Sequence, residues 1–301
     1  MTSFKIMVDT SCDLPGEYLE EHGLEMIPIP FTLDGVQHSG GHWQEIEDRE
    51  FYKALGSGSV AGTALINPET LVQEFSGYAE RGEALLVILL SSGLSGTYQN
   101  SVIALDEVRG KYPDCDIHTV DSINAAGGIG LLTTLAVKKR AEGLSAGDTA
   151  AWLEQKKNSC VSLFTVDDLM YLHRGGRLTK LSAVAGSIIG IKPLLNVAPD
   201  GTLTLKDKVR GRQGALKTIV SQMVRSLDPE ASLDTVIISH TNCLEDAETT
   251  ASLVKSSVDA KEVVVVMMGP VIGAHVGPGT IALFFEAGMT RAEYERKFYG
   301  K

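Results

Sequence analysis

The sequence predicts an α/β protein with two domains, on three observations. Predicted strands alternate with predicted helices through the first half of the 301-residue chain, which is typical of a parallel sheet. Residues 84–90 form a continuous apolar run, the pattern of a central strand covered on both faces. The second half mixes helices with a hairpin signal, Pro-Asp-Gly at 199–201, and indicates an α+β layer. We place the boundary near residue 160, which gives domains 1–160 and 161–301.

The first domain opens with a strand, because apolar residues alternate at positions 4, 6 and 8. A helix follows between Asp13 and Gly23, with Pro15 in its first turn. Residues 25–60 predict a short strand and a loop-rich subregion with one small helix near 48–55. The alternation then resumes with helix 68–79, strand 84–90, helix 95–109, strand 116–120, helix 125–141 and a helix that Ser145 caps and that ends near 158.

The second domain has a less regular order. Its expected elements are strand 161–166, short helices at 169–172 and 181–189, hairpin strands 193–197 and 202–209, helix 213–227, strand 235–240, helix 244–258 and strands 263–268 and 280–286. This mixture of a hairpin with helices is what predicts the α+β layer.

Composition and charge narrow the function. Hydrophobic residues make up 44% of the chain and charged residues 22%, which suits a soluble globular protein with a sizeable core. The net charge of −11 argues against binding to nucleic acid, which needs a basic surface. No apolar run approaches the roughly 18 residues of a membrane span, and the first residues do not form a signal peptide, so we expect a cytoplasmic protein. The four cysteines have no C-x-x-C spacing, so we expect reduced thiols and no metal site.

The segment SSGLSGT at 91–97 joins the buried strand to a helix. Backbone N–H groups at a helix start carry partial positive charge, and the glycines let a ligand approach, so an anion site is one interpretation. The hydroxyls of Ser92, Ser95 and Thr97 would add donors. Ser95 as a simple helix cap is the other interpretation. GLSGT departs from the G-x-S-x-G of a nucleophile elbow, which weakens a hydrolase interpretation.

Two loops near the predicted sheet are weaker candidates. Thr63, in AGTALINP at 61–68, could donate its hydroxyl to a ligand or be an ordinary loop threonine. The preceding GSGSVA follows a helix rather than a strand, so we reject it as a dinucleotide fingerprint. Asp121 and Ser122 close a strand at the edge where open α/β sheets bind ligands, but a turn role fits them equally.

Basic residues and a histidine supply further candidates. LHRGGRL at 172–178 places Arg174 and Arg177 around a Gly-Gly turn, and arginine presents a planar fork for carboxylate or phosphate. Solvated surface charge explains these residues as well. Arg210 lies on a later segment that could converge with them. In GPVIGAHVGPG at 269–279, His275 could donate to a bound anion or could be a structural histidine.

In combination these segments resemble the DegV family. DTSCDL at 9–14 is similar to the family's opening D-S/T-S/T-x-D-L signature. The other hallmarks follow in order, as SSGLSGTY at 91–98, VDS at 120–122, LHRGGRL at 172–178, IKPLL at 191–195, VRG at 209–211 and GPVIGAHVGPG at 269–279. The resemblance therefore covers essentially the whole chain.

The resemblance implies a DegV-like fold, with an N-terminal parallel-sheet α/β domain, a C-terminal α+β domain and a lipid between them. Family members bind fatty acids, and in bacteria with a fatty acid kinase they are its binding subunits. We therefore expect a long-chain fatty acid, such as palmitate, stearate or oleate, in a buried apolar tunnel. The resemblance further implies that the kinase phosphorylates the presented carboxylate for phospholipid synthesis, that membrane contact is transient, and that there is no cofactor.

The resemblance also assigns residues. Thr63 and Ser95 match the hydroxyls that hold the carboxylate, and His275 matches a histidine beside it. The expected ligand-binding set is Thr63, Ser92, Ser95, Gly96, Arg174 and His275, and the expected partner-binding set is Arg174, Arg177 and Arg210. The family's P-x-T-S-x-P reads AGTALI at 61–66 in this chain, which keeps the threonine and replaces the following serine with Ala64.

Elementary physics agrees with a carrier. A carboxylate held by neutral hydroxyls and N–H groups stays nucleophilic, whereas a tight bidentate arginine would mask it. Burying about 15 methylenes gains on the order of 12 kcal/mol before binding costs. The sequence contains no phosphate-binding G-x-x-x-x-G-K-[ST], so we expect no catalytic residue and a separate chain for phosphoryl transfer. Two rivals remain: an esterase that uses Ser95 with His275 and Asp121, and a sensor with a short polar cavity for a small anion.

Overall fold

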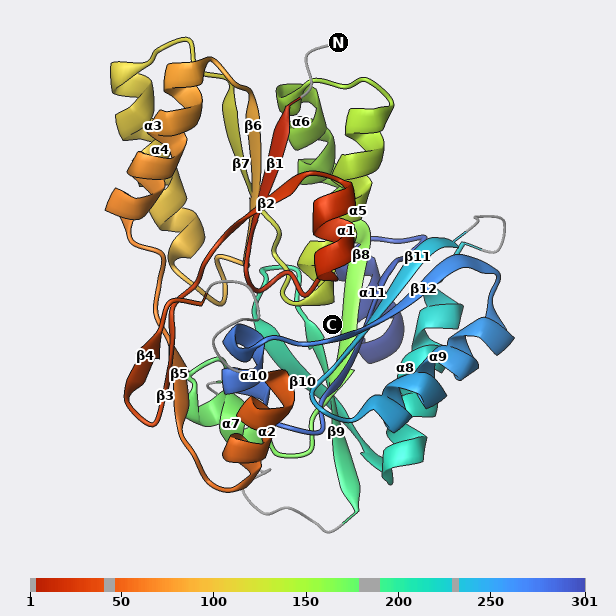
Figure 1. Ribbon diagram of the computed structural model, residues 1–301. Coiled ribbons are helices and arrows are strands. Elements are labelled where there is room, and N and C mark those ends of the chain that lie inside the picture. The colour runs from red at the N-terminus through yellow and green to blue at the C-terminus, as the bar shows by residue number, and fades with distance from the viewer. Residues whose placement is uncertain (1–3, 41–46, 179–189, 229–232, 301) are drawn as a thin grey trace.

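The computed structural model describes residues 4–40, 47–178, 190–228 and 233–300, and these residues form three sheets (Figure 1). The helix predicted at 181–189 lies outside the described residues. Helices pack between and around the sheets, so the described chain has the α/β architecture that the sequence predicts (Figure 1).

A parallel sheet in the order β2-β1-β6-β7 forms the core of the first half. Its strands are β1 (Lys5–Asp9), β2 (Leu24–Ile27), β6 (Leu85–Leu89) and β7 (Ile117–Asp121). The accompanying helices are α1 (Gly16–Glu21), α3 (Pro68–Arg81), α4 (Thr97–Lys111), α5 (Gly127–Ala141), α6 (Ala146–Lys156) and the short η1 (Lys157–Ser159). The pair α3 and α4 covers one face and the pair α5 and α6 the other, which explains why every residue of β6 is buried (Figure 1).

A small antiparallel sheet, β4-β3-β5, lies within the region predicted to be rich in loops. Its strands are β3 (Phe31–Leu33), β4 (Val36–His38) and β5 (Ala61–Thr63), and helix α2 (Asp48–Gly56) packs with them. Strands of three residues are too short to show an alternating pattern, so the prediction missed this sheet. It has its own core, made of Phe31, Phe51, Tyr52, Leu55 and Ala274.

The second half forms a mixed sheet in the order β10-β9-β8-β13-β11-β12. Only the β11–β12 pair is parallel among the described strands of this sheet. The strands are β8 (Cys160–Thr165), β9 (Ile191–Val197), β10 (Leu203–Arg210), β11 (Leu233–His240), β12 (Ala260–Met267) and β13 (Ile281–Glu286). The helices of this half are α7 (Leu169–Arg174), α8 (Arg212–Ser226), α9 (Leu244–Ser257), α10 (Pro270–Val276) and α11 (Arg291–Tyr299).

Helices α10 and α11 were not expected. α10 occupies the Gly/Pro-rich segment that looked like a specialised loop, and it begins with Pro270 in its first turn and ends before Gly277, which has φ 69°. Proline at a helix start and glycine just after its end are ordinary helix signals. α11 begins with a capping box between Thr290 and Glu293 and ends at a left-handed Gly300.

Helix α5 connects the two halves, because it packs against strands of both large sheets. Eleven of its residues, in an unbroken run from Gly127 to Val137, are buried. A Cβ on Gly127 would lie 2.6 Å from a methyl carbon of Ile237 and 2.8 Å from the ring of Phe284. The glycine therefore permits the close approach of this helix to the second sheet.

Candidate ligand-binding site

A narrow apolar cavity lies between the layers of the two halves. Measured as the space open to the centre of a water molecule, its volume is about 70 Å³. Its apolar wall includes Leu90, Ala126, Phe164, Leu203, Val276 and Phe284, which come from elements on both sides of the boundary near residue 160. A mostly apolar cavity with a few polar groups is typical of a small-molecule binding site.

Five polar residues line this cavity, Thr280 and a group of four, which are Thr63, Ser95, Arg177 and His275. Three of them, Thr63, Arg177 and His275, also line an adjoining vestibule of about 250 Å³ that contains Arg174. We call these four wall residues the polar end. Three of the residues predicted to bind the ligand, Thr63, Ser95 and His275, are thus brought together from β5, the β6–α4 loop and α10.

Thr63 is joined to His275 by a hydrogen bond between Oγ1 and Nε2 of 2.8 Å. The threonine is the last residue of β5, and the next residue, Ala64, donates its backbone N–H to the carbonyl of Pro30 at 2.9 Å. The small sheet therefore holds the threonine in place although the second hydroxyl of the family pattern is missing.

His275 is a neutral histidine in a buried setting. Burial lowers its pKa from 6.5 to about 4, and the nearby positive charge of Arg177 adds to the effect. Its Nδ1 is buried and has no hydrogen-bond partner among the described residues. Gly175 packs against this nitrogen so closely that a Cβ there would lie 2.3 Å from it.

Ser95 precedes α4, which begins at Thr97 rather than at Ser95 as predicted, with Gly96 as its N-cap. The Ser95 hydroxyl accepts the backbone N–H of Thr97 at 3.2 Å and donates to the Thr97 side chain at 3.1 Å. The helix-cap and ligand interpretations remain compatible, because the Ser95 hydroxyl accepts an N–H of the first turn while the half-buried residue lines the cavity.

Arg177 lies at the polar end, although the resemblance placed it among the partner-binding residues. Its Nε donates to the carbonyl of Leu94 at 3.1 Å and its Nη1 to that of Gly175 at 2.5 Å. Burial lowers the pKa of its guanidinium, and no acidic side chain pairs with it among the described residues. The arginine thus offers an uncompensated positive charge beside His275.

Other predicted site residues lie apart from the cavity wall. The Ser92 hydroxyl donates to Asp121 at 2.5 Å, and Ser92 is exposed. Gly96 is also exposed and does not line the cavity. Arg174 lies over the ring of Tyr171, with 4.8 Å between the guanidinium carbon and the ring centroid, and reaches only the vestibule. Arg210 ends β10 on the surface and lines neither space.

The DTSCDL signature near the start of the chain positions two segments that carry site residues. The buried Asp9 carboxylate accepts the backbone N–H of Leu90 at 2.6 Å, where the SSGLSGT segment begins. Asp13 accepts the backbone N–H of Gly269 at 2.9 Å, immediately before α10. The two aspartates therefore hold the elements that carry Ser95 and His275 and do not themselves line the cavity.

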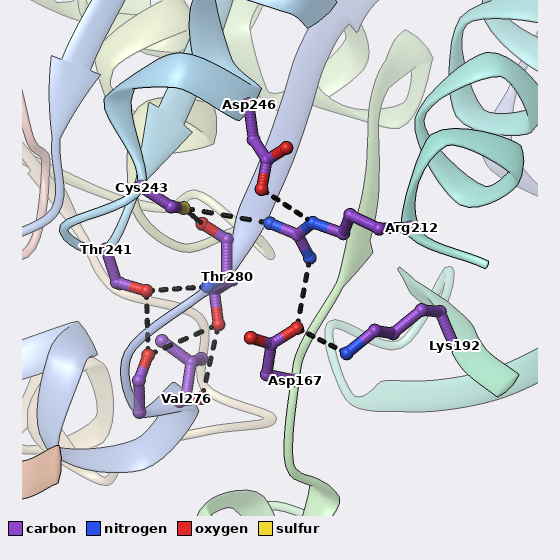
Figure 2. Close-up of polar contacts among 9 residues, drawn as sticks. Asp167, Lys192, Arg212, Thr241, Cys243, Asp246, Val276 and Thr280 are labelled. Atoms are coloured by element: carbon purple, nitrogen blue, oxygen red, sulfur yellow. Dashed lines mark hydrogen bonds and ion pairs between the residues drawn. The ribbon is translucent and has the colours of Figure 1, made fainter. Parts of the chain in front are cut away.

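A charged cluster lies beside Thr280, one of the residues of the cavity wall (Figure 2). Asp167, just after β8, accepts Lys192 at 2.6 Å and Arg212 at 3.5 Å, and Arg212 also donates to Asp246 at 2.8 Å. Within the same cluster, the Cys243 thiol donates to the carbonyl of Thr280, a residue of the cavity wall (Figure 2). Sequence reasoning missed this cluster because its members are far apart in the chain.

The geometry does not assemble the esterase triad that was one rival. Asp121 bonds to Ser92 and to the backbone of Ile123, while His275 bonds to Thr63. Within the described ranges no hydrogen bond joins Ser95 to His275. The parts of the chain that the structure describes also contain no group of three or more potential metal ligands and no helix able to span a membrane.

The fold and cavity are those of a two-domain α/β protein with a buried, mostly apolar cavity between its layers. The chain belongs to the DegV family, since the family model described as "Uncharacterised protein, DegV family" matches residues 3–288, and this confirms the resemblance. A DegV domain-containing protein of Clostridium perfringens is 35% identical over 286 residues, which is 95% of this chain and 98% of that relative.

Solved structures of the same fold are similar over nearly the whole chain. A Thermotoga maritima protein described as revealing fatty acid binding function has a TM-score of 0.83 and 27% identity, and the match covers 95% of this chain and 100% of that one. A stearic acid-binding protein from Eubacterium ventriosum has a TM-score of 0.82 and 25% identity, with 97% and 99% covered. The comparisons thus agree with the predicted fold class.

Proposed function

We propose that this protein binds a long-chain fatty acid, with the alkyl chain in the apolar cavity and the carboxylate at the polar end. The observation that carries the proposal is a narrow apolar cavity that meets Thr63, Ser95, His275 and Arg177. A small polar anion would leave the apolar wall unused, so this lining disfavours the sensor. The fatty acid-binding proteins of the same fold support the assignment.

The polar end suits a carboxylate through neutral donors. The Nδ1 of His275 has no acceptor among the described residues, so placing the imidazole proton on Nε2 avoids a buried, unpaired N–H. Nε2 then donates to Thr63 Oγ1, and the threonine hydroxyl is left to donate to the carboxylate. Ser95 supplies a second hydroxyl, and the charge of Arg177 offsets the negative charge of the ligand.

We further propose that the bound carboxylate is presented to the catalytic subunit of a fatty acid kinase, which forms the acyl-phosphate. The vestibule beside the polar end supports this step, because it gives access to Thr63 and His275. Arg174, at the vestibule, and Arg210, on the surface, are the proposed kinase contacts. In this proposal the protein supplies no catalytic group, exchanges its ligand through transient contact with membranes and acts in the cytoplasm.

Native mass spectrometry of protein expressed in lipid-containing medium tests ligand binding. We expect an added mass that extraction and fragmentation identify as a fatty acid. Persistent absence of any fatty acid after lipid supplementation would contradict the proposal, and turnover of a simple ester that Ser95→Ala abolishes would favour the esterase instead.

Thr63→Val tests the polar end directly. The substitution keeps the shape and removes the hydroxyl, so fatty acid affinity should fall about 10-fold or more, as expected for a hydrogen bond to a charged group. Thr32→Val is the matched control, because Thr32 lies on the neighbouring strand β3 and does not line the cavity. Equal affinities for the two variants in a fluorescent fatty acid titration would exclude a hydrogen bond from Thr63 to the fatty acid.

A further inference from the structure

The turn between β9 and β10 covers the apolar cavity. Val197, at the end of β9, and Leu203, at the start of β10, both line it, and the turn residues between them meet the first domain. A Cβ on Gly93 would lie 2.7 Å from the backbone carbon of Gly201. The backbones of the turn and of the SSGLSGT segment are therefore in direct contact, and no alkyl chain fits between them.

Among the described residues, one hydrogen bond joins this turn to the first domain. The Ser91 hydroxyl donates to the carbonyl of Gly201 at 2.9 Å, in a buried position. The bond that Arg291, on α11, donates to the carbonyl of Ala198 at 3.4 Å lies within the second domain. A single neutral hydrogen bond is a weak tie compared with short, charge-assisted bonds.

The surface that receives the turn is firmly held. Ile123 packs beneath Gly201 and has φ 44°, which is unusual for a β-branched residue. Its N–H donates to Asp121 at 2.8 Å, and its carbonyl accepts Arg291 at 2.5 Å. Short bonds on both sides of Ile123 keep this strained residue in place, so the turn is the part that can move.

Among the described residues, stronger contacts separate the vestibule from the apolar wall. Arg177 makes charge-assisted bonds from its guanidinium to the carbonyls of Leu94 and Gly175. A fatty acid tail that entered from the vestibule would also have to pass the polar end first. Separation of the β9–β10 turn therefore exposes the apolar wall at lower cost than disruption of the arginine contacts.

We propose that the β9–β10 turn, residues 197–203, is the gate through which the ligand enters and leaves, and that the Ser91–Gly201 hydrogen bond is its latch. This inference rests on the proposed fatty acid binding. Opening the gate exposes Val197 and Leu203 together with Leu94 on the opposite side, which forms an apolar slot that accepts an alkyl chain from the side. The latch acts on the closed protein with or without ligand, so it controls the rates of exchange and not the equilibrium affinity.

Ser91→Ala tests the latch. Transfer of a fluorescent polyene fatty acid between the protein and phosphatidylcholine vesicles should become about 2- to 10-fold faster in both directions, the factor that a typical net hydrogen-bond contribution predicts. The dissociation constant should stay unchanged. Ser92→Ala is the matched control, because the hydroxyl of Ser92 bonds to Asp121 and does not touch the turn.

The outcomes separate the two proposals. Wild-type protein that never binds the probe overturns the proposed function, and the gate with it. Normal binding with exchange rates that are equal in Ser91→Ala, Ser92→Ala and wild type overturns the gate alone.

Discussion

At the scale of single residues, the polar end depends on keeping His275 uncharged. The burial that lowers its pKa to about 4 leaves a neutral imidazole at physiological pH. A neutral ring can hold Thr63 by one hydrogen bond without pairing tightly with a carboxylate. The same burial lowers the stability of the folded state in acid, because His275 binds a proton more readily in the unfolded chain than in the folded protein.

This cost predicts a specific pH dependence of stability. Between pH 6.5, the ordinary pKa, and about 4, the folded pKa, the unfolded state binds more protons at His275, so the free energy of unfolding falls as pH falls. The contribution amounts to at most about 3 kcal/mol. Denaturant titrations should therefore show that His275→Gln loses less stability than wild type from pH 7 to 4. Parallel losses in the two proteins would contradict the lowered pKa, and His118→Gln, on β7, controls for the loss of a histidine.

The residues able to form the site could be predicted from the sequence. Which of them line the cavity could not be predicted. Thr63, Ser95 and His275 were selected from the sequence and do share the cavity wall. Ser92 was selected on the same grounds, yet its hydroxyl is occupied by Asp121. Arg177, which the resemblance matched to the headgroup opening and the kinase-facing surface, lines both the polar end and the vestibule. Sequence identifies groups able to bind a carboxylate, whereas tertiary contacts decide which of them line the cavity.

At the scale of elements, the contact between α7 and α10 orients the histidine. The turn after α7 brings Gly175 against His275, and Tyr52 of α2 donates to the carbonyl of Met268 at 2.7 Å just before α10. α10 has only seven residues, and a helix of this length depends on such tertiary contacts for its stability. Its capping signals were present in the sequence, but the density of glycine around it favoured a loop.

Gly175→Ala tests this contact. The added methyl would lie 2.3 Å from His275 Nδ1, so the ring or the turn must shift and the bond from His275 to Thr63 should weaken. Fatty acid affinity should fall about 10-fold, measured by fluorescence titration, which corresponds to about 1.4 kcal/mol. Gly56→Ala, at the end of α2, meets no atom within 4 Å and should bind as wild type does. Unchanged affinity in Gly175→Ala would show that the site tolerates a displaced histidine.

At the scale of the whole molecule, α5 makes the two halves one structure. The division near residue 160 follows the sheets, since the strands of the last sheet all begin at or after Cys160. Helix α5, which precedes this division in the chain, is however buried between both large sheets. The sequence of α5 shows the all-round apolar character of a buried helix. It does not show which two surfaces bury the helix, because that depends on the arrangement of both sheets.

Gly127→Ala should therefore destabilise both halves together. Its methyl group would lie within 2.8 Å of Ile237, Ser239 and Phe284, and such overpacking typically costs about 1–3 kcal/mol. Because α5 packs on both sheets, we expect calorimetry to show one transition at a lower Tm, with equal calorimetric and van't Hoff enthalpies. Gly110→Ala, in α4, meets no atom within 4 Å and should keep or raise the wild-type Tm. Two separate transitions, with only one of them shifted, would contradict this prediction. They would show that α5 stabilises only one half and that the two domains beside the cavity unfold independently.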